Sequence, residues 1–552
     1  MGFDLKTLSV ANFQSLKAPC SLPIRPLTLL FGPNSAGKSA INDALALVSM
    51  MLGNQWFDRR KECTALINRW KYNDGSENSS APLTLAVEGE LQGSLGEWDY
   101  SNSSSVYLFW NILRQKYPDL ATGWPDSRPL SIQIEIDESD VHIEYSLDNL
   151  PIIGISPERI DIHLDHPLLL DVFRSRLPPE IFNSVRGDDS IRVTVNECLF
   201  RLDGAQTEGR YIHWTEFQEW LDLDESFCDL VIRTTELFTI LISENVANAL
   251  QPLCVSGQRT VPRHSELVFY VPHNEVLGRK DYRKRKSPLI KLIESQVHFP
   301  KTAYFSSLAE AGLAAVLRGL MKESTDNEKE NNVVIEPLGR YLDLEDRFNR
   351  VNQALSTHLF LERGYQVTIQ AQLMLSTPLH EIILNKNIDV DEVMDGSSLV
   401  SLGLIDNQGR SVRLDDVGSG ISYVLPVLAA GWSYERQIVF IEQPELHLHP
   451  ALQAGLADAL IEITNTGRQL IVETHSEHLI LRLLRRIRET NAKRTASPEL
   501  RFDPDQVSVF YFNPSLDGTT RVRHIRISDT GEFLTPWPRG FFTEREEDLF
   551  DE

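Results

Sequence analysis

The sequence has no long hydrophobic run, and this limits where the protein can work. No apolar stretch approaches the ~18 residues that a membrane-spanning helix needs. The N-terminus also lacks the basic and then apolar layout of a signal peptide. We therefore expect a cytoplasmic protein that makes no contact with a membrane.

Cysteine is scarce as well, with five residues in a chain of 552. The five are widely scattered, and no two of them form a C-x-x-C pair: Cys20, Cys63, Cys198, Cys228 and Cys254. Zinc sites and redox disulfides depend on such close spacings. We expect neither kind of site, and isolated thiols suit a reducing compartment.

Positive charge is also in short supply. Lysine and arginine number 54 against 78 acidic residues, which gives a formal net charge of −24. A protein that binds duplex DNA by releasing counterions usually presents a basic face. The densest basic segment is GRKDYRKRK, whose lysines and arginines lie within residues 279–286. This segment is either a solvated loop, as most charge runs are, or a contact for nucleic acid or an acidic partner.

Local patterns predict both strands and helices. LKTLSVANF, LTLAVEGEL, LSIQIEID and VHIEYSL alternate with a period of two, whereas LEDRFNRVNQALSTHLF has a helical period. ELVFYVP, residues 266–272, is expected to return the chain to the main sheet. The chain has no repeat of 20–50 residues and no long heptad run, which excludes a solenoid and an extended coiled-coil arm.

The stretch GPNSAGKS, residues 32–39, fits the pattern G-x-x-x-x-G-K-[S/T] between an apolar strand and an amphipathic helix. Its two glycines allow the backbone to curl so that successive N–H groups face phosphate oxygens. Lys38 supplies a cation for the β- and γ-phosphates, and Ser39 supplies a hydroxyl for Mg²⁺. We predict that ATP binds here through Asn34, Ser35, Ala36, Gly37, Lys38 and Ser39.

Two later strands end in polar residues that fit the same site. QIVFIEQPE (437–445) is an apolar strand that ends at Glu442, a candidate ligand of Mg²⁺ together with Ser39. RQLIVETHSEHLI (468–480) contains a second apolar strand, which ends just before His475. A histidine at the tip of the neighbouring strand can reach the γ-phosphate, so His475 is a candidate catalytic residue.

These motifs resemble those of ATP-binding-cassette-type ATPases. More narrowly, they are similar to the RecF, SMC and OLD-like group that is often described loosely as AAA ATPases, and to the ATPase subunit of Septu-type antiphage systems. The likeness covers roughly residues 1–50, 265–310 and 400–545, including ISDTGEFLTPWPRGFF near the C-terminus. It implies an α/β fold: an ABC-type P-loop ATPase head with an antiparallel β subdomain and a mixed or helical insertion.

The resemblance also implies a division of the chain into four ranges. Residues 1–55 and 399–552 would form the two parts of the ATPase domain, the first with the phosphate loop and the second with the signature, the acidic strand end and His475. Residues 56–265 would hold the β subdomain and the insertion. Residues 266–398 would form a helical and linker region with returning strands.

In this family two copies enclose each ATP between the phosphate loop of one and a signature helix of the other. The candidate signature is DVGSGISYVLPVL (416–428), in which Gly418 and Gly420 allow a helix start to approach the partner's γ-phosphate. It departs from the usual LSGGQ pattern, so either Ser419 or Ser422 can be the signature serine. The alternative is a glycine-rich turn before a core helix.

Gln443 stands where the family carries its general base, and glutamine cannot accept a proton. It can still orient water, as a glutamine does in some GTPases. Glu445 is the other candidate base, provided that the strand end bends. His447 and His449 fall in the segment that crosses between subunits in this family, where we favour packing and interface roles over a metal site. We therefore expect ATP hydrolysis that is slow or stimulated by a partner.

Three functions follow from these features. The leading hypothesis is an ATPase subunit that pairs around ATP as a homo-oligomer and regulates a separate effector, such as an HNH nuclease, in prokaryotic antiphage defence. OLD-type enzymes append a nuclease domain of about a hundred residues or more, whereas 77 residues follow His475, so we expect any nuclease to act from another chain. The alternatives are a RecF-like DNA-repair ATPase and a scaffold that holds ATP as a structural ligand.

Overall fold

The structure is a computed structural model of the 552-residue chain. It describes residues 2–53, 70–71, 81–92, 127–137, 141–156, 159–163, 166, 192–196, 199–203, 212–213, 242–257, 268–272, 338–361, 363–374, 397–414, 416–432, 438–494 and 497–538. The chain forms two compact units, each built from separate stretches. The first contains Met1–Ile24, Pro33–Pro252 and Phe512–Arg523, and the second contains Arg25–Gly32, Leu253–Tyr511 and His524–Glu552.

A ten-stranded antiparallel sheet dominates the first unit, in the order β11-β10-β9-β8-β7-β6-β5-β4-β1-β2. Its strands are β1 (Gly2–Ala11), β2 (Cys20–Pro23), β4 (Leu83–Gln92), β5 (Ser127–Ile136), β6 (Val141–Leu147), β7 (Leu150–Ser156), β8 (Arg159–His163), β9 (Arg192–Asn196), β10 (Leu199–Asp203) and β11 (Ile212–His213). Every second residue of β6 is buried, as the alternating sequence predicts. Helices α1 (Ala40–Leu52) and α9 (Ser243–Leu250) pack on each other, and the Ser49 hydroxyl donates to the Ala247 carbonyl.

A second sheet has the order β12-β17-β18-β3-β19-β20. The strands are β12 (Leu253–Val255), β17 (Ile438–Glu442), β18 (Gln469–Glu473), β3 (Leu27–Phe31), β19 (Val507–Pro514) and β20 (Thr520–His524). From β12 to β19 each neighbouring pair is parallel. All five residues of β3 are buried, as is expected of a central strand in a parallel sheet.

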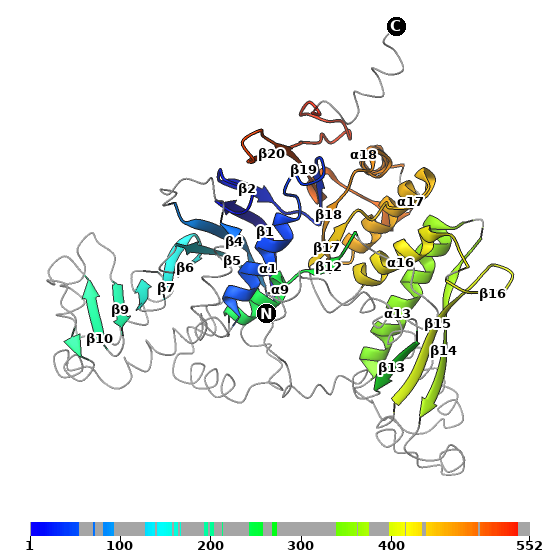
Figure 1. The fold of residues 1–552 in the computed structure, drawn as a ribbon, viewed down its shortest axis with the longest axis horizontal. Coiled ribbons are helices and arrows are strands. Elements are labelled where there is room, and N and C mark those ends of the chain that lie inside the picture. The colour runs from blue at the N-terminus through cyan, green and yellow to red at the C-terminus, as the bar shows by residue number, and fades with distance from the viewer. Residues whose placement is uncertain are drawn as a thin grey trace, which may run out of the picture. The chain divides into compact units, whose positions relative to one another are not determined.

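Helices of the second unit cover this parallel sheet, and Figure 1 shows α17 (Pro450–Thr464) and α18 (Glu477–Asn491) beside β17 and β18. Helix α16 (Ser419–Gly431) and helix α13 (Leu338–Ala354), which continues into a π-helical turn, η4 (Leu355–Leu359), also belong to this unit. A smaller antiparallel sheet has the order β13-β15-β14, and β16 also pairs with β15. Its strands are β13 (Val268–Pro272), β14 (Gln366–Met374), β15 (Ser397–Ile405) and β16 (Ser411–Val412).

The predicted α/β class, with an antiparallel β subdomain, is confirmed by these sheets. The prediction that residues 266–272 return the chain to the main sheet is wrong, because β13 pairs with β15 in the smaller sheet. The return is made earlier, by the three-residue strand β12, which pairs with β17. The basic segment 279–286 lies outside the described residues. No described helix is long and apolar enough to cross a membrane.

Candidate nucleotide-binding site

The glycine loop leaves the buried strand β3 and leads into helix α1. Three residues take left-handed backbone angles: φ is 140° at Gly32, 61° at Ser35 and 85° at Gly37. Such angles turn successive peptide groups inward, and glycine adopts them without the steric cost that a Cβ brings. Ser39 is the N-cap residue of α1, so the positive end of the helix dipole lies at the loop.

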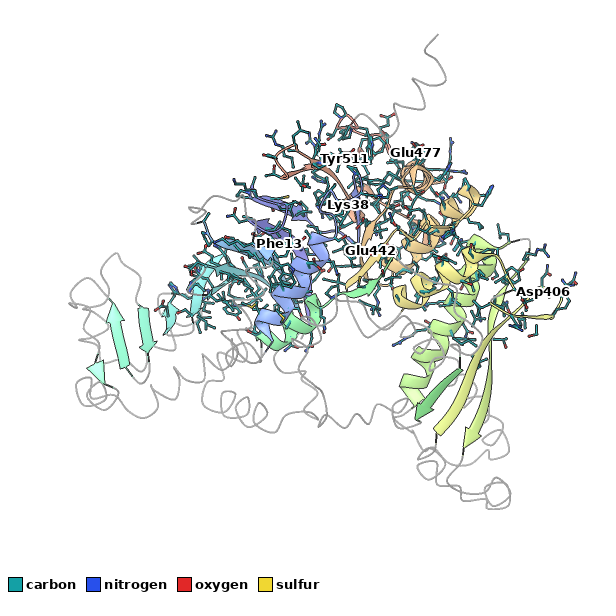
Figure 2. The ribbon with its side chains drawn as sticks, in the orientation of Figure 1. Phe13, Lys38, Asp406, Glu442, Glu477 and Tyr511 are labelled. Atoms are coloured by element: carbon teal, nitrogen blue, oxygen red, sulfur yellow. The ribbon has the colours of Figure 1, made fainter. Side chains whose placement is uncertain are left out.

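Lys38 lies within the loop rather than extending into solvent. Its side chain is 2% exposed, and its Nζ donates to the backbone carbonyl of Pro33 at 2.8 Å. The ammonium is therefore held above the same backbone that would surround a phosphate. Figure 2 labels Lys38 at this position, next to α1.

The second unit supplies three strand ends at one edge of its sheet. Strands β17, β18 and β3 are parallel neighbours, so their carboxyl ends meet there. Glu442 stands directly opposite Glu473 in the register, and the N–H of Thr474 donates to the Leu30 carbonyl at 3.1 Å. The acidic strand end, the Thr-His-Ser turn and the point where β3 passes into the glycine loop therefore share this edge.

A backbone contact from β12 holds Glu442. The N–H of Gly257, just after β12, donates to Glu442 Oε2 at 2.8 Å. A Cβ on Gly257 would lie 3.3 Å from Gln443 Oε1, so a larger residue would press on Gln443 and on Glu442, the last residue of β17. No pattern in the sequence predicts this contact, because β12 is too short for a periodic signal. Figure 2 labels Glu442 at the end of its strand.

The chain turns sharply at Gln443, which has a φ of 44°. Its N–H donates to the Glu473 carbonyl at 2.7 Å and so extends the β17–β18 ladder by one bond. A left-handed angle at a residue other than glycine costs about 1–3 kcal/mol and is concentrated at functional sites. The bend that Glu445 would need in order to act as the base is therefore present.

Glu445 is buried, and both of its carboxylate oxygens accept hydrogen bonds. Oε2 accepts from Thr474 Oγ1 at 2.8 Å, and Oε1 accepts from the backbone N–H of His475 at 2.7 Å. A carboxylate held in this way fixes the turn that carries His475. We conclude that Glu445 joins the segment after β17 to the turn after β18.

A further chain of hydrogen bonds continues from this turn into the helices. Thr474 Oγ1 accepts from the Ser476 N–H at 3.1 Å, and the Ser476 hydroxyl donates to Gln453 Oε1 at 2.6 Å. Ser476 also caps α18 by accepting from the Leu479 N–H. Gln453 on α17 in turn donates to the Leu448 carbonyl at 3.0 Å. The two loops at this sheet edge are thus tied to each other and to both helices.

The candidate signature lies at the start of α16, where Gly418 is the N-cap residue. Ser422 is 1% exposed and donates to the Leu414 carbonyl at 3.2 Å, whereas Ser419 is exposed in the first turn. A Cβ on Gly420 would lie 3.2 Å from the His447 carbonyl oxygen. The ring of Tyr423 lies 4.5 Å from that of His447, so α16 packs against the segment after β17.

The side chains at this site have the types of ligand atom that suit a magnesium ion. Hydroxyl and carboxylate oxygens, as in Ser39 and Glu442, are the hard ligands that Mg²⁺ prefers. Within the described residues no group of three or more His, Cys, Asp or Glu side chains could hold a metal. This is compatible with nucleotide-bound Mg²⁺, which takes most of its ligands from phosphate and water.

The parallel sheet, the glycine loop that enters α1 and the acidic strand end define a P-loop nucleotide-binding domain. Comparison with protein families agrees: residues 314–480 match the model of the AAA ATPase domain. The matched range holds the candidate signature, Glu442 and His475, and the glycine loop lies outside it. The ATPase part of the resemblance is therefore confirmed, whereas the narrower likeness to Septu-type subunits stays a prediction.

Solved structures with similar chain paths include SMC head domains. One is an SMC head bound to the C-winged helix domain of ScpA, with 12% identity and a TM-score of 0.37 over 95% of this chain and 98% of that chain. Another is the SMC head domain from Thermotoga maritima, with 10% identity and a TM-score of 0.33 over 95% of this chain and 100% of that chain. None of the curated proteins is a significant match to this chain. With TM-scores below 0.5, these structures add nothing to what the strand order and the loop already establish.

Proposed function

We propose that the protein is an ATP-binding subunit that pairs around ATP, hydrolyses it slowly and regulates a separate effector. The observation that supports this best is the shared sheet edge. There, the exit of β3 into the glycine loop lies beside the His475 turn after β18, and that turn lies beside the acidic end of β17. This is the arrangement that P-loop ATPases use to bring phosphate, metal and attacking water together.

In this proposal the first unit's loop binds the phosphates. The N–H groups of the loop and the start of α1 face the anion, and Lys38 moves from the Pro33 carbonyl to the β- and γ-phosphates. Ser39 and Glu442 are the protein ligands of the magnesium ion, which neutralises phosphate charge when it is bound. His475 faces the γ-phosphate from the neighbouring strand end.

Pairing around ATP is proposed from α16. Ser419 is exposed at the helix start, whereas the hydroxyl of Ser422 is used inside the unit. Ser419, with Gly418 and Gly420, is therefore our candidate for contact with the ATP of a second copy. The helix dipole of α16 favours a negative phosphate at that end.

The proposed effector is a separate protein such as an HNH nuclease, and the setting is antiphage defence. Support for this step comes from the resemblance to OLD-like and Septu-type ATPases alone. Affinity purification from the native host, with ATP and Mg²⁺ present, tests it directly. We expect one stoichiometric partner whose recovery falls when Lys38 is replaced, and recovery of the protein by itself would contradict the proposal.

Nucleotide binding is the first test of the site. Lys38→Ala should weaken ATP binding about 100-fold, because a charge-assisted hydrogen bond is worth about 1.5–3 kcal/mol and several phosphate charges lose their partner. Isothermal titration calorimetry with ATP and Mg²⁺ measures this. Lys6→Ala is the matched control, since Lys6 is an exposed lysine of the same unit that pairs with Asp4. Equal affinity in wild type and Lys38→Ala would show that the site lies elsewhere.

A further inference from the structure

A strand near the C-terminus contacts the glycine loop directly. Thr520, the first residue of β20, donates its hydroxyl to the backbone carbonyl of Ala36 at 2.9 Å. The two residues are 484 positions apart in the chain, and both belong to the first unit. Thr520 is 5% exposed and Ala36 is fully buried, so water does not substitute for this bond. The sequence pattern assigned no role to Thr520.

The bond fixes the orientation of one peptide group in the loop. In a trans peptide the C=O and the following N–H point in opposite directions. Because Thr520 holds the Ala36 carbonyl toward β20, the N–H of Gly37 on the same peptide points away from β20. Phosphate loops bind their anion through inward-facing N–H groups of this kind. Without the hydroxyl, the buried carbonyl of Ala36 would lose its partner, and rotation of the peptide would turn the Gly37 N–H aside.

A second contact holds Thr520 and the N-terminal loop together. The N–H of Thr520 donates to the Ser15 carbonyl at 2.8 Å. Ser15 also closes the space beside Gly37, where an added Cβ would overlap Ser15 Oγ and lie 3.7 Å from Thr520 Oγ1. Gln14, the neighbour of Ser15, donates its side-chain amide to Asp43 of α1 at 2.7 Å. The loop is therefore enclosed by β20 and by the turn after β1.

We propose that Thr520 is a positioning residue of the nucleotide site: its hydroxyl orients the Ala36–Gly37 peptide so that the Gly37 N–H faces the phosphates of bound ATP. This rests on the proposed function, because it assumes that ATP binds at the glycine loop. It extends that function by making the β19–β20 hairpin part of the binding site. Thr520 acts through the loop and does not touch the nucleotide.

The test is ATP affinity, measured by isothermal titration calorimetry with ATP and Mg²⁺ on the full chain. Thr520→Val keeps the shape of the side chain and removes the hydroxyl, so we expect about tenfold weaker binding, equivalent to about 1.4 kcal/mol. Thr520→Ser keeps the hydroxyl and should bind like wild type. Thr519→Val is the matched control, since the Thr519 hydroxyl bonds only to Asp517 within the hairpin turn. The melting temperature without nucleotide is measured for each variant.

The outcomes separate this proposal from the proposed function. If Lys38→Ala binds ATP normally, the proposed site is wrong. If Lys38→Ala loses binding and Thr520→Val keeps it, the site stands and the role of Thr520 is overturned. Where Thr520→Val does not fold, Thr520→Ser and Thr520→Ala give the same comparison, because they too differ by the hydroxyl. Equal affinities in that pair would also overturn the proposal, as would weakening by Thr519→Val to the same extent.

Discussion

At the scale of single residues, the side chains after β17 bear on whether the protein would hydrolyse ATP or only bind it. Gln443 directly follows the proposed metal ligand Glu442, and an amide can orient water without accepting its proton. Glu445, the other candidate base, has both carboxylate oxygens engaged by Thr474 and His475. A carboxylate with both oxygens hydrogen-bonded in this way fixes the position of His475, and it is poorly suited to accept a proton from water. Slow hydrolysis is the expected consequence.

Replacing Gln443 with glutamate would place a general base at the position proposed to face the attacking water. We expect wild-type turnover far below the ~10 s⁻¹ of a median enzyme. Gln443→Glu should raise it by about 100-fold or more, because general base catalysis contributes about 10²–10⁴-fold. Single-turnover hydrolysis with saturating ATP and Mg²⁺ measures the chemical step. The same change should shorten the ATP-bound state and weaken any output that depends on it.

The matched control is Glu477→Gln, which removes a carboxylate from the first turn of α18. It should leave the hydrolysis rate unchanged. Fast wild-type turnover that Gln443→Glu does not alter and that Glu445→Gln abolishes would identify Glu445 as the base instead. His475→Ala should lower the rate of ATP hydrolysis and leave ATP affinity unchanged, since we expect His475 to contact only the γ-phosphate of ATP.

At the scale of secondary-structure elements, a buried ion-pair cluster joins α17 to α18. The Asp458 carboxylate, 3% exposed, accepts from Arg482 and from Arg486, with its shortest contacts at 2.6 Å and 2.8 Å. Burial raises the pKa of Asp458, but the hydrogen bonds and charges of Arg486 and Arg482 outweigh it, so the net pKa lies below its usual range. Arg486 also pairs with Glu489. The two helices that carry the Thr-His-Ser turn and the segment after β17 are thus fixed together.

Removing the Asp458 carboxylate should therefore lower the free energy of unfolding substantially. Asp458→Asn should destabilise the protein by about 3–5 kcal/mol, because the buried Arg486 would lose one of its two anions and Arg482 would lose the same partner. Arg485→Gln is the matched control on the same helix, and its exposed pair with Glu489 is worth about 0–1 kcal/mol. Chemical denaturation at pH 7 measures both. A change below about 1 kcal/mol in Asp458→Asn would contradict the role given to the cluster.

The pH dependence follows from the sign of the same shift. A carboxyl whose pKa is lower in the folded state stabilises the fold above its unfolded pKa of about 3.9, and this stability is lost as the pH falls through the folded value. Wild type should therefore lose stability below about pH 4 more steeply than Asp458→Asn does. Parallel acid-denaturation slopes in the two proteins would contradict this.

Strands with a clear local pattern were predictable, whereas pairings between distant strands were not. The alternation in β1, β4, β5 and β6 comes from one buried face, and the glycine loop has its own spacing, so both are visible in the sequence. Strand β12 has three residues, too few for any period to show. Residues 268–272 have the pattern of a strand, but their partner is chosen by register with β15, more than a hundred residues later.

The candidate site shows the same limit. Its motif residues were found from spacing, but their hydrogen bonds depend on side chains that meet only in the fold. Glu445 finds its partners 29 and 30 residues away, Gly257 reaches Glu442 across 185, and Thr520 reaches Ala36 across 484. No local sequence pattern predicts such contacts, because a short motif reflects only the backbone conformation that its own residues require.

At the scale of the whole molecule, each compact unit is assembled from stretches that are far apart in the sequence. Strand β3 and Gly32 belong to the second unit, and the rest of the glycine loop, from Pro33 on, belongs to the first. The proposed pairing of two copies adds a contact from the α16 of the other copy.

Pairing should therefore depend on nucleotide and on the start of α16. We expect ATP with Mg²⁺ to double the mass measured by light scattering, and Ser419→Arg to prevent this because its bulk blocks the close approach of the helix start to the partner's ATP. Ser419 is a better position than Gly420, because a side chain at Gly420 would press on the His447 carbonyl and Leu448 within its own chain. Ser411→Arg, at an exposed serine of β16, is the control and should pair normally.

The interpretation requires both the light-scattering mass and the ATP affinity of each variant. Ser419→Arg should keep most of the affinity of a single copy for ATP, since the loop residues Lys38 and Ser39 are unchanged. A monomer with and without nucleotide in wild type would overturn the pairing. A dimer in both conditions that Ser419→Arg leaves intact would overturn it equally, because the contact would then involve neither ATP nor the signature helix. If the mass doubles only in wild type and Ser411→Arg, the exposed start of α16 is the surface through which ATP joins two copies.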